Sequence, residues 1–248
     1  MVPHPVPYIA VAVDHGMSLV RRVVAAGMAA SATEEVRARL VAMALASGAD
    51  AVVIPPDASL LTAIAGRRPA DQDIWLGLPD LVVDAEAAWA EALVRAVGLL
   101  RTGVATGIKV AFVRDDALDW SQALDQAAAS IDDQHRLIVE PYFKADDPAD
   151  VRHDVLTVCR EVTNLRFLKC DVDGTARHAE LYSAAGVPWL ARSDGLSFAA
   201  FTAAYRVAAA HGCAGVMAGA ALWSDALAGG DAVASRVHAL RAVTSDRR

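Results

Sequence analysis

Short β-rich runs alternate with longer alanine-rich runs along the whole 248-residue chain, and this alternation most constrains the fold. The β-rich runs are mostly apolar, as expected of strands that are buried on both faces of a parallel sheet. Eight such runs are predicted as strands: Tyr8–Val13, Ala51–Ile54, Ile74–Leu78, Ile108–Val113, Leu137–Glu140, Phe167–Cys170, Trp189–Arg192 and Gly215–Ala218. The segment from Trp75 to Pro79, which overlaps the third run, is equally compatible with a loop.

The intervening runs carry apolar residues at the three-to-four spacing of a helix that covers a sheet. They predict helices at Thr33–Ala46, Ala85–Leu100, Ser121–Ser130, Ala149–Val162, Ala176–Ala185 and Phe198–Ala210. Eight strands separated by helices favour a closed α/β structure, the (β/α)₈ TIM barrel, with residues 1–248 as one domain. An open, doubly wound sheet is the alternative, but no Gly-x-Gly-x-x-Gly follows the first strand.

Composition and charge restrict the class of protein. With 55% hydrophobic residues the chain is suited to a packed core, and its net charge of −7 leaves no basic stripe for nucleic acid. Every long apolar run is broken before it reaches the length of a membrane span. The three cysteines have neither disulfide nor metal-site spacing, and we expect a cytoplasmic protein that binds neither nucleic acid nor membrane.

Lysine is rare in this chain: only three of the 23 basic residues are lysines, and the others are arginines. Lys144 lies in a polar segment, whereas Lys109 and Lys169 lie within predicted buried strands. An ammonium group among apolar residues is costly unless it is paired or loses its proton. A lysine with a lowered pKa is the usual amine nucleophile of Schiff-base chemistry.

Polar residues also follow several predicted strands, at the ends where the active site of a barrel lies. They are Asp14, His15, Asp57, Glu140, Asp171, Ser193, Asp194 and Gly219. In a closed barrel Lys109, Glu140 and Lys169 come from neighbouring strands and converge on one axis. They supply an amine nucleophile, a second cation that depresses its pKa and a carboxyl group that moves protons, as imine catalysis requires.

Each of these residues also has a structural explanation. Lys169 alternatively points outward with its stem along a helix, because strand alternation leaves the direction open by one residue. Lys109 alternatively acts as the buried ion-pair partner of Glu140, which is compatible with a role in proton transfer. Glu140 alternatively holds a loop.

Asp14, His15 and Asp57 are potential metal ligands. No His-x-His or His-x-x-x-His spacing supports a metal site, however. We therefore expect neither a metal nor another cofactor.

Four segments together resemble class I (Schiff-base) aldolases of the tagatose-1,6-bisphosphate aldolase and sulfofructosephosphate aldolase group, in the deoxyribose-phosphate aldolase-like barrel superfamily. The segments are Ala12 to Arg21, Gly107 to Val110, Leu165 to Val172 and Pro188 to Leu222. The resemblance covers almost the whole chain, and the order and spacing of the segments are more specific than any single motif.

The resemblance implies an aldehyde-lyase of carbohydrate metabolism that makes or breaks a C–C bond of a ketose and needs no metal. It implies that Lys169 forms the Schiff base, that Glu140 is the general acid/base with Lys109 beside it, and that Asp14 binds the donor hydroxyls. It places substrate-binding positions at His15, Arg192, Ser193, Asp194, Gly195, Gly219 and Ala220. It also implies a small ketose or aldehyde as partner molecule and a homo-oligomer.

The chain departs from the family pattern where an anion would bind. After the eighth strand the family reads Gly-Arg-x-Ile/Val-Trp, and here Ala220 replaces the arginine that clamps phosphate. After the seventh strand Asp194 replaces a small residue, and an aspartate beside phosphate-binding N–H groups repels a dianion. We therefore expect either a phosphate or sulfonate sugar or an unphosphorylated variant, with Arg192 as the alternative source of positive charge.

Three functions fit these observations. A class I aldolase is favoured by the order of Lys109, Glu140 and Lys169 on successive strands. A barrel lyase or isomerase that uses Lys169 as a base without a covalent intermediate is the next alternative. A non-catalytic, ligand-binding relative of the aldolases is the third, and the loss of the arginine at Ala220 favours it.

Overall fold

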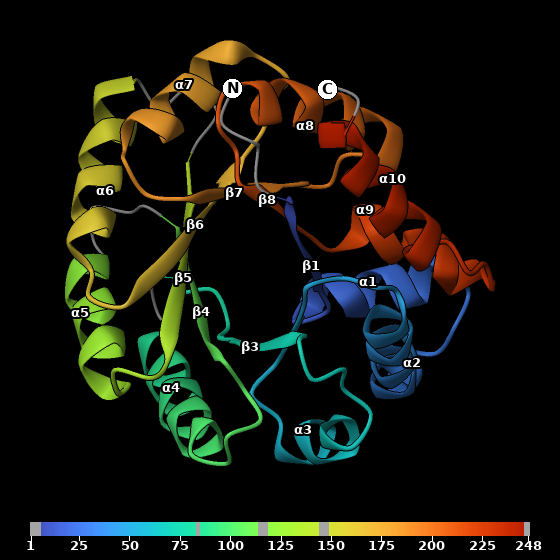
Figure 1. The fold of residues 1–248 in the computed structure, drawn as a ribbon. Coiled ribbons are helices and arrows are strands. Elements are labelled where there is room, and N and C mark those ends of the chain that lie inside the picture. The colour runs from blue at the N-terminus through green and yellow to red at the C-terminus, as the bar shows by residue number, and fades with distance from the viewer. Residues whose placement is uncertain (1–5, 83–84, 114–118, 144–148, 246–248) are drawn as a thin grey trace.

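The computed structural model describes residues 6–82, 85–113, 119–143 and 149–245, and Lys144 lies outside these ranges. The described residues form eight parallel strands that close into a barrel in chain order, with β8 paired to β1 (Figure 1). The strands are β1 Tyr8–Ala12, β2 Ala51–Ile54, β3 Asp73–Gly77, β4 Gly107–Val113, β5 Arg136–Tyr142, β6 Leu165–Asp171, β7 Trp189–Arg192 and β8 Gly215–Ala218. The predicted (β/α)₈ barrel is confirmed.

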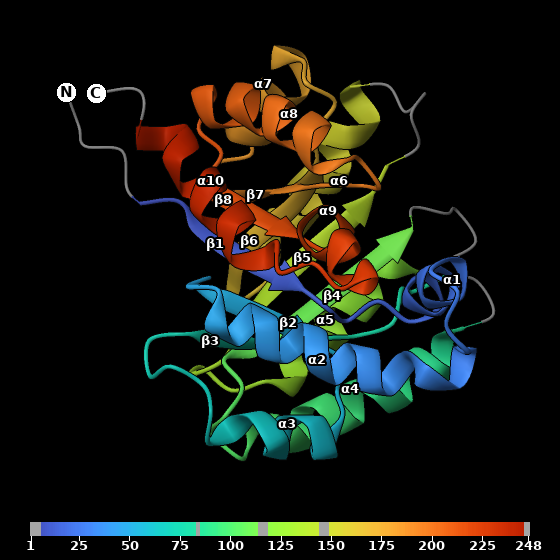
Figure 2. The same cartoon turned by 90° about the vertical axis from the view of Figure 1, so that its right-hand side faces the viewer.

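Helices surround the strands. They are α1 Met17–Ala25, α2 Thr33–Ala46, α3 Ala58–Ala65, α4 Glu86–Leu100, α5 Trp120–Ser130, α6 Ala149–Glu161, α7 Ala176–Ala184, α8 Phe198–Ala210, α9 Ala220–Trp223 and α10 Val233–Ser245. Near the end of the chain α10 packs against α2 and α8 and so joins the first and last units of the ring (Figure 2). None of the helices in the described ranges has the length and hydrophobicity that crossing a lipid bilayer requires.

Two apolar clusters fill the molecule, one on each side of the strands. The larger lies between the strands and the helices. The smaller, which we call the interior cluster, fills the inside of the barrel with Ala10, Ala12, Ala51, Val53, Trp75, Ile138, Phe167, Leu190 and Met217. Strand side chains alternate between the two faces, so a residue two positions beyond a member of the interior cluster also points inward.

Sequence and structure agree closely on the strands and on most predicted helices. The third strand, for which a loop was the alternative, pairs with β2 and β4 on its two sides, for example Trp75 with Val53 and Gly107. The helices α1, α3, α9 and α10 were not predicted. With four residues, α9 is too short for an apolar spacing to be visible in the sequence.

Candidate active site

Five charged residues lie at the carboxyl ends of their strands, in the layer next to the interior cluster. Asp14, Glu140, Lys169 and Arg192 each follow a member of that cluster by two positions. Lys109 follows Gly107 by two positions, and a Cβ added to Gly107 would lie 2.6 Å from the ring of Trp75, a member of the interior cluster. All five side chains therefore point into the barrel, and the outward alternative for Lys169 is wrong.

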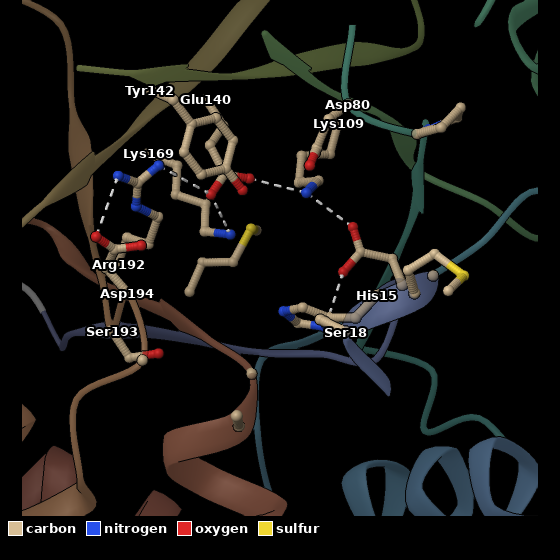
Figure 3. Close-up of a pocket in the computed structure, with 18 of the residues that line it drawn as sticks. His15, Ser18, Asp80, Lys109, Glu140, Tyr142, Lys169, Arg192, Ser193 and Asp194 are labelled. Carbon is tan, nitrogen blue, oxygen red and sulfur yellow. Dashed lines mark hydrogen bonds and ion pairs between the residues drawn. The ribbon is translucent and has the colours of Figure 1, made fainter. Parts of the chain in front are cut away.

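The charged groups form a chain of close contacts (Figure 3). Lys109 Nζ lies 2.8 Å from Asp14 Oδ2 and 2.8 Å from Glu140 Oε2. The other oxygen of Glu140, Oε1, lies 2.8 Å from Lys169 Nζ. Glu140 is fully buried, and Lys109 and Lys169 are each 4% exposed. The predicted ion pair of Lys109 with Glu140 is confirmed, and alternating charges explain why so many ions are tolerated in the barrel.

The two lysines have opposite pKa shifts, although burial disfavours the ammonium form of both. The pKa of Lys109 is well above its usual value, because attraction by Asp14 and Glu140 outweighs burial. The pKa of Lys169 is lowered, because burial together with repulsion from Lys109 outweighs the attraction of Glu140. Lys169 is therefore the lysine that gives up its proton more readily, and its free amine is a nucleophile.

The two carboxylates stay ionised. Burial raises their pKa values, but the neighbouring cations outweigh it: the pKa of Asp14 falls to about 2, and that of Glu140 lies well below its usual range. At neutral pH Glu140 is a proton acceptor and a counter-ion, without a proton of its own to donate.

Tyr142, at the end of β5, supplies a neutral donor that the sequence analysis missed. Its ring lies against the guanidinium of Arg192, with 4.1 Å between the guanidinium carbon and the ring centre (Figure 3). Burial and the nearby Glu140 raise the pKa of its hydroxyl, which therefore keeps its proton. The signal was present in the sequence, because Tyr142 follows Glu140 by two positions and so shares its side of the strand.

A cavity of about 570 Å³ opens above this charged layer. All eleven predicted site residues line it: Asp14, His15, Lys109, Glu140, Lys169, Arg192, Ser193, Asp194, Gly195, Gly219 and Ala220. Nine further lining residues were not predicted as site residues: Gly16, Met17, Ser18, Arg22, Leu78, Pro79, Asp80, Tyr142 and Met217. Asp57 does not line it: its carboxylate accepts a hydrogen bond from Leu60 N and caps α3.

The imidazole of His15 occupies the carboxyl end of β8. A Cβ added to Gly219 would lie 2.2 Å from a ring carbon of His15, and the ring meets Trp223 edge-on with centres 5.9 Å apart. Burial lowers the pKa of His15 to about 4, so the ring is neutral at neutral pH. A neutral ring therefore fills the space beside Gly219, which precedes Ala220 in the chain.

Gly77 makes room for Asp14, and we expect Gly77→Ala to destabilise the barrel. A Cβ at this position would lie 2.1 Å from Asp14 Oδ2, so the carboxylate must move away from Lys109. Overpacking of this kind lowers the free energy of unfolding by about 1–3 kcal/mol, to be measured by urea denaturation. Gly98→Ala in α4 is the matched control, because an added Cβ there meets nothing within 4 Å. Equal stability of the two variants would contradict the account of Gly77.

No protein-family model and no curated protein matches the sequence. Solved structures do match over nearly the whole chain. A Corynebacterium glutamicum protein is 16% identical, with a TM-score of 0.64, 98% of this chain covered and 86% of that one. An archaeal fructose-1,6-bisphosphate aldolase is 13% identical, with a TM-score of 0.64, and the match covers 95% of this chain and 94% of the aldolase chain. That aldolase was solved with its catalytic lysine covalently bound to the carbinolamine intermediate of the substrate.

A fructose-bisphosphate aldolase from Slackia heliotrinireducens is 11% identical, with a TM-score of 0.59, 98% of this chain covered and 86% of that one. At these identities the likeness establishes a shared barrel fold. The chain therefore has the same fold as class I aldolase-like TIM barrels.

Proposed function

We propose that this protein is a class I aldolase, a lyase whose Lys169 forms a Schiff base with a ketone donor. The observation that carries the proposal is the contrast between the two buried lysines. Both line the open cavity, but Lys109 is held as a cation between Asp14 and Glu140, whereas Lys169 contacts Glu140 alone and has a lowered pKa. The aldolase fold of the structural neighbours supports the same chemistry.

The first steps build the imine. The lone pair of neutral Lys169 Nζ attacks the ketone carbon, and the C=O π electrons move to the oxygen, which takes up one of the two protons of the attacking nitrogen. The resulting carbinolamine loses its hydroxyl group as water after a second protonation, and the nitrogen lone pair forms the C=N bond of a cationic iminium. The protonated hydroxyl of Tyr142 is the donor at hand, and Arg192 against its ring favours the phenolate that this donation leaves behind.

The iminium then allows the C–C bond to break. The electrons of the bond form the C=C bond of an enamine, and the C=N π electrons return to nitrogen and neutralise it. The hydroxyl proton of the departing fragment passes to Glu140, leaving an aldehyde. This transfer is well timed, because Glu140 loses a neighbouring positive charge at the moment when the iminium is neutralised. Protonation of the enamine carbon and hydrolysis return the free lysine.

Borohydride trapping tests the proposal. The protein is incubated with hydroxyacetone, dihydroxyacetone and dihydroxyacetone phosphate, reduced, digested and read by peptide mass spectrometry. A reduced adduct on Lys169 supports the Schiff-base mechanism. Labelling of no lysine, under conditions that label a known class I aldolase, would contradict it and favour a non-covalent enzyme or a binding barrel.

Replacing Lys109 changes the pH dependence of imine formation in a defined direction. Lys109 repels the ammonium form of Lys169 and shares Glu140 with it, so Lys109→Met raises the pKa of Lys169. We expect the trapping rate to reach its half-maximum at a higher pH, with a roughly tenfold lower rate at neutral pH for each unit of pKa increase. Lys109→Arg keeps the charge and stays closer to the wild-type midpoint. A lower midpoint in Lys109→Met would be inconsistent with this electrostatic role.

A further inference from the structure

Arg192 is a buried cation whose hydrogen bonds are incomplete. Its side chain is only 6% exposed, yet Nε and Nη1 are buried and have no hydrogen-bond partner among the described residues. Glu140 Oε1 lies 3.6 Å from Nη1 and Asp194 Oδ2 lies 3.9 Å from Nη2, both beyond hydrogen-bond length. Unpaired buried donors are costly, so this guanidinium, which lines the cavity, is suited to an anionic ligand.

The position of Arg192 defines which part of a ligand it would meet. One oxygen atom, Glu140 Oε1, lies 2.8 Å from Lys169 Nζ and 3.6 Å from Arg192 Nη1. Figure 3 shows the guanidinium and the amine on the same side of the cavity, with Tyr142 beside them. An anionic group bonded directly to the carbon that reacts with Lys169 would therefore reach Arg192.

Charge indicates which anion fits. With Lys169 as its ammonium or as the iminium, the buried layer holds three cations (Lys109, Lys169 and Arg192) and two anions (Asp14 and Glu140), so it carries one excess positive charge. A carboxylate neutralises this excess, whereas a phosphate dianion would reverse it next to Glu140. A carboxylate also matches the planar fork of a guanidinium and accepts two hydrogen bonds from it.

We propose that the donor of the proposed aldolase is a 2-oxo carboxylic acid, whose carboxylate is bound by Arg192 while its keto carbon forms the imine with Lys169. The inference rests on the proposed function and specifies its substrate class. A 4-hydroxy-2-oxo acid would bind in the same way. Cleavage of its C3–C4 bond sends the electron pair into the enamine and the hydroxyl proton to Glu140, and releases an aldehyde. Protonation at C3 and hydrolysis then release the shorter 2-oxo acid.

The test compares two ketones of similar size in the borohydride assay. Pyruvate carries a carboxylate on the keto carbon, and hydroxyacetone carries a neutral hydroxymethyl group there. We expect pyruvate to label Lys169 faster in the wild type. In Arg192→Met the ratio of the pyruvate rate to the hydroxyacetone rate should fall by about 10- to 100-fold, because a charge-assisted, bidentate interaction is lost. Arg192→Lys keeps the charge without the fork and should give an intermediate ratio.

Arg95→Met is the matched control, because it removes the same charge from an exposed position on α4, with a side chain 58% exposed. In this variant the ratio of the pyruvate rate to the hydroxyacetone rate should remain that of the wild type. A further comparison needs no variant: methyl pyruvate lacks the carboxylate charge but is the more reactive ketone, so faster labelling by pyruvate itself supports the inference even if Arg192→Met does not fold.

The outcomes separate the two proposals. Faster labelling of Lys169 by hydroxyacetone or dihydroxyacetone phosphate than by pyruvate would overturn the inference and leave the Schiff-base mechanism standing. An unchanged ratio in folded Arg192→Met would overturn it as well. Labelling of Lys169 by none of the ketones would contradict the proposed function itself, and the inference with it.

Discussion

Lys169→Met should abolish C–C cleavage without unfolding the protein. Methionine has a similar length but no amine, so no imine forms, and we expect activity towards the best donor of the trapping panel to fall by about 10⁴-fold or more. Stability should stay near that of the wild type or rise. Glu140 remains paired with Lys109 at 2.8 Å, and the loss of the Lys169 ammonium removes the excess positive charge of the buried layer. Steady-state kinetics and thermal denaturation measure the two effects separately.

Lys169→Arg is the second variant for this prediction. It keeps a positive charge beside Glu140 and has no nucleophilic amine at accessible pH, so it should be as inactive as Lys169→Met. If either variant retained a tenth of the wild-type activity, the Schiff base at this position would be refuted and a non-covalent mechanism favoured.

The fold was predictable because buried parallel strands are visible in sequence as short apolar runs. For β2, β7 and β8 the predicted bounds coincide with those observed, and so do those of α2 and α8. The direction of a strand side chain was less certain, because a shift of one residue reverses it. Barrel closure removes that uncertainty by placing Phe167 inside, and Lys169 then follows on the same side.

The membership of the site was predictable, but its electrostatics were not. All predicted site residues line the cavity, because the carboxyl ends of parallel strands meet at one end of a barrel. Which lysine gives up its proton depends on contacts of 2.8 Å between side chains, which no sequence pattern encodes. The pairing of Lys109 with Asp14 in addition to Glu140 decides that Lys109 is the stable cation and Lys169 the better nucleophile.

Glu140→Gln should uncouple imine formation from C–C cleavage. The variant keeps Lys169 and lowers the pKa of its ammonium further, because the attraction of the carboxylate is lost. Borohydride trapping should therefore persist and reach its half-maximum at a lower pH than in the wild type. Cleavage should slow by about 10²- to 10⁴-fold, as expected when the group that accepts the hydroxyl proton is removed. Wild-type cleavage rates in this variant would contradict the assignment of Glu140.

Glu140→Gln should also lose stability in a pH-dependent way. Three cations, Lys109, Lys169 and Arg192, would share Asp14 as the one remaining anion of the layer, and breaking a buried pair typically costs about 3–5 kcal/mol. Lys169 has a lower pKa in the folded state than in the unfolded state. Between these two pKa values the unfolded state binds more protons, so the free energy of unfolding rises as the pH rises through this range. The loss should therefore be largest at neutral pH and shrink towards pH 10.5, the ordinary pKa of lysine.

Urea denaturation at several pH values measures this loss. Glu161→Gln is the matched control, because Glu161 forms an exposed pair with Arg160 at 3.3 Å and such pairs contribute about 0–1 kcal/mol. Equal stability losses in Glu140→Gln and Glu161→Gln at neutral pH would mean that Glu140 does not bind the cations together. A loss confined to Glu140→Gln that shrinks as the pH rises is expected if this buried carboxylate stabilises the charged layer by attracting the ammonium group of Lys169.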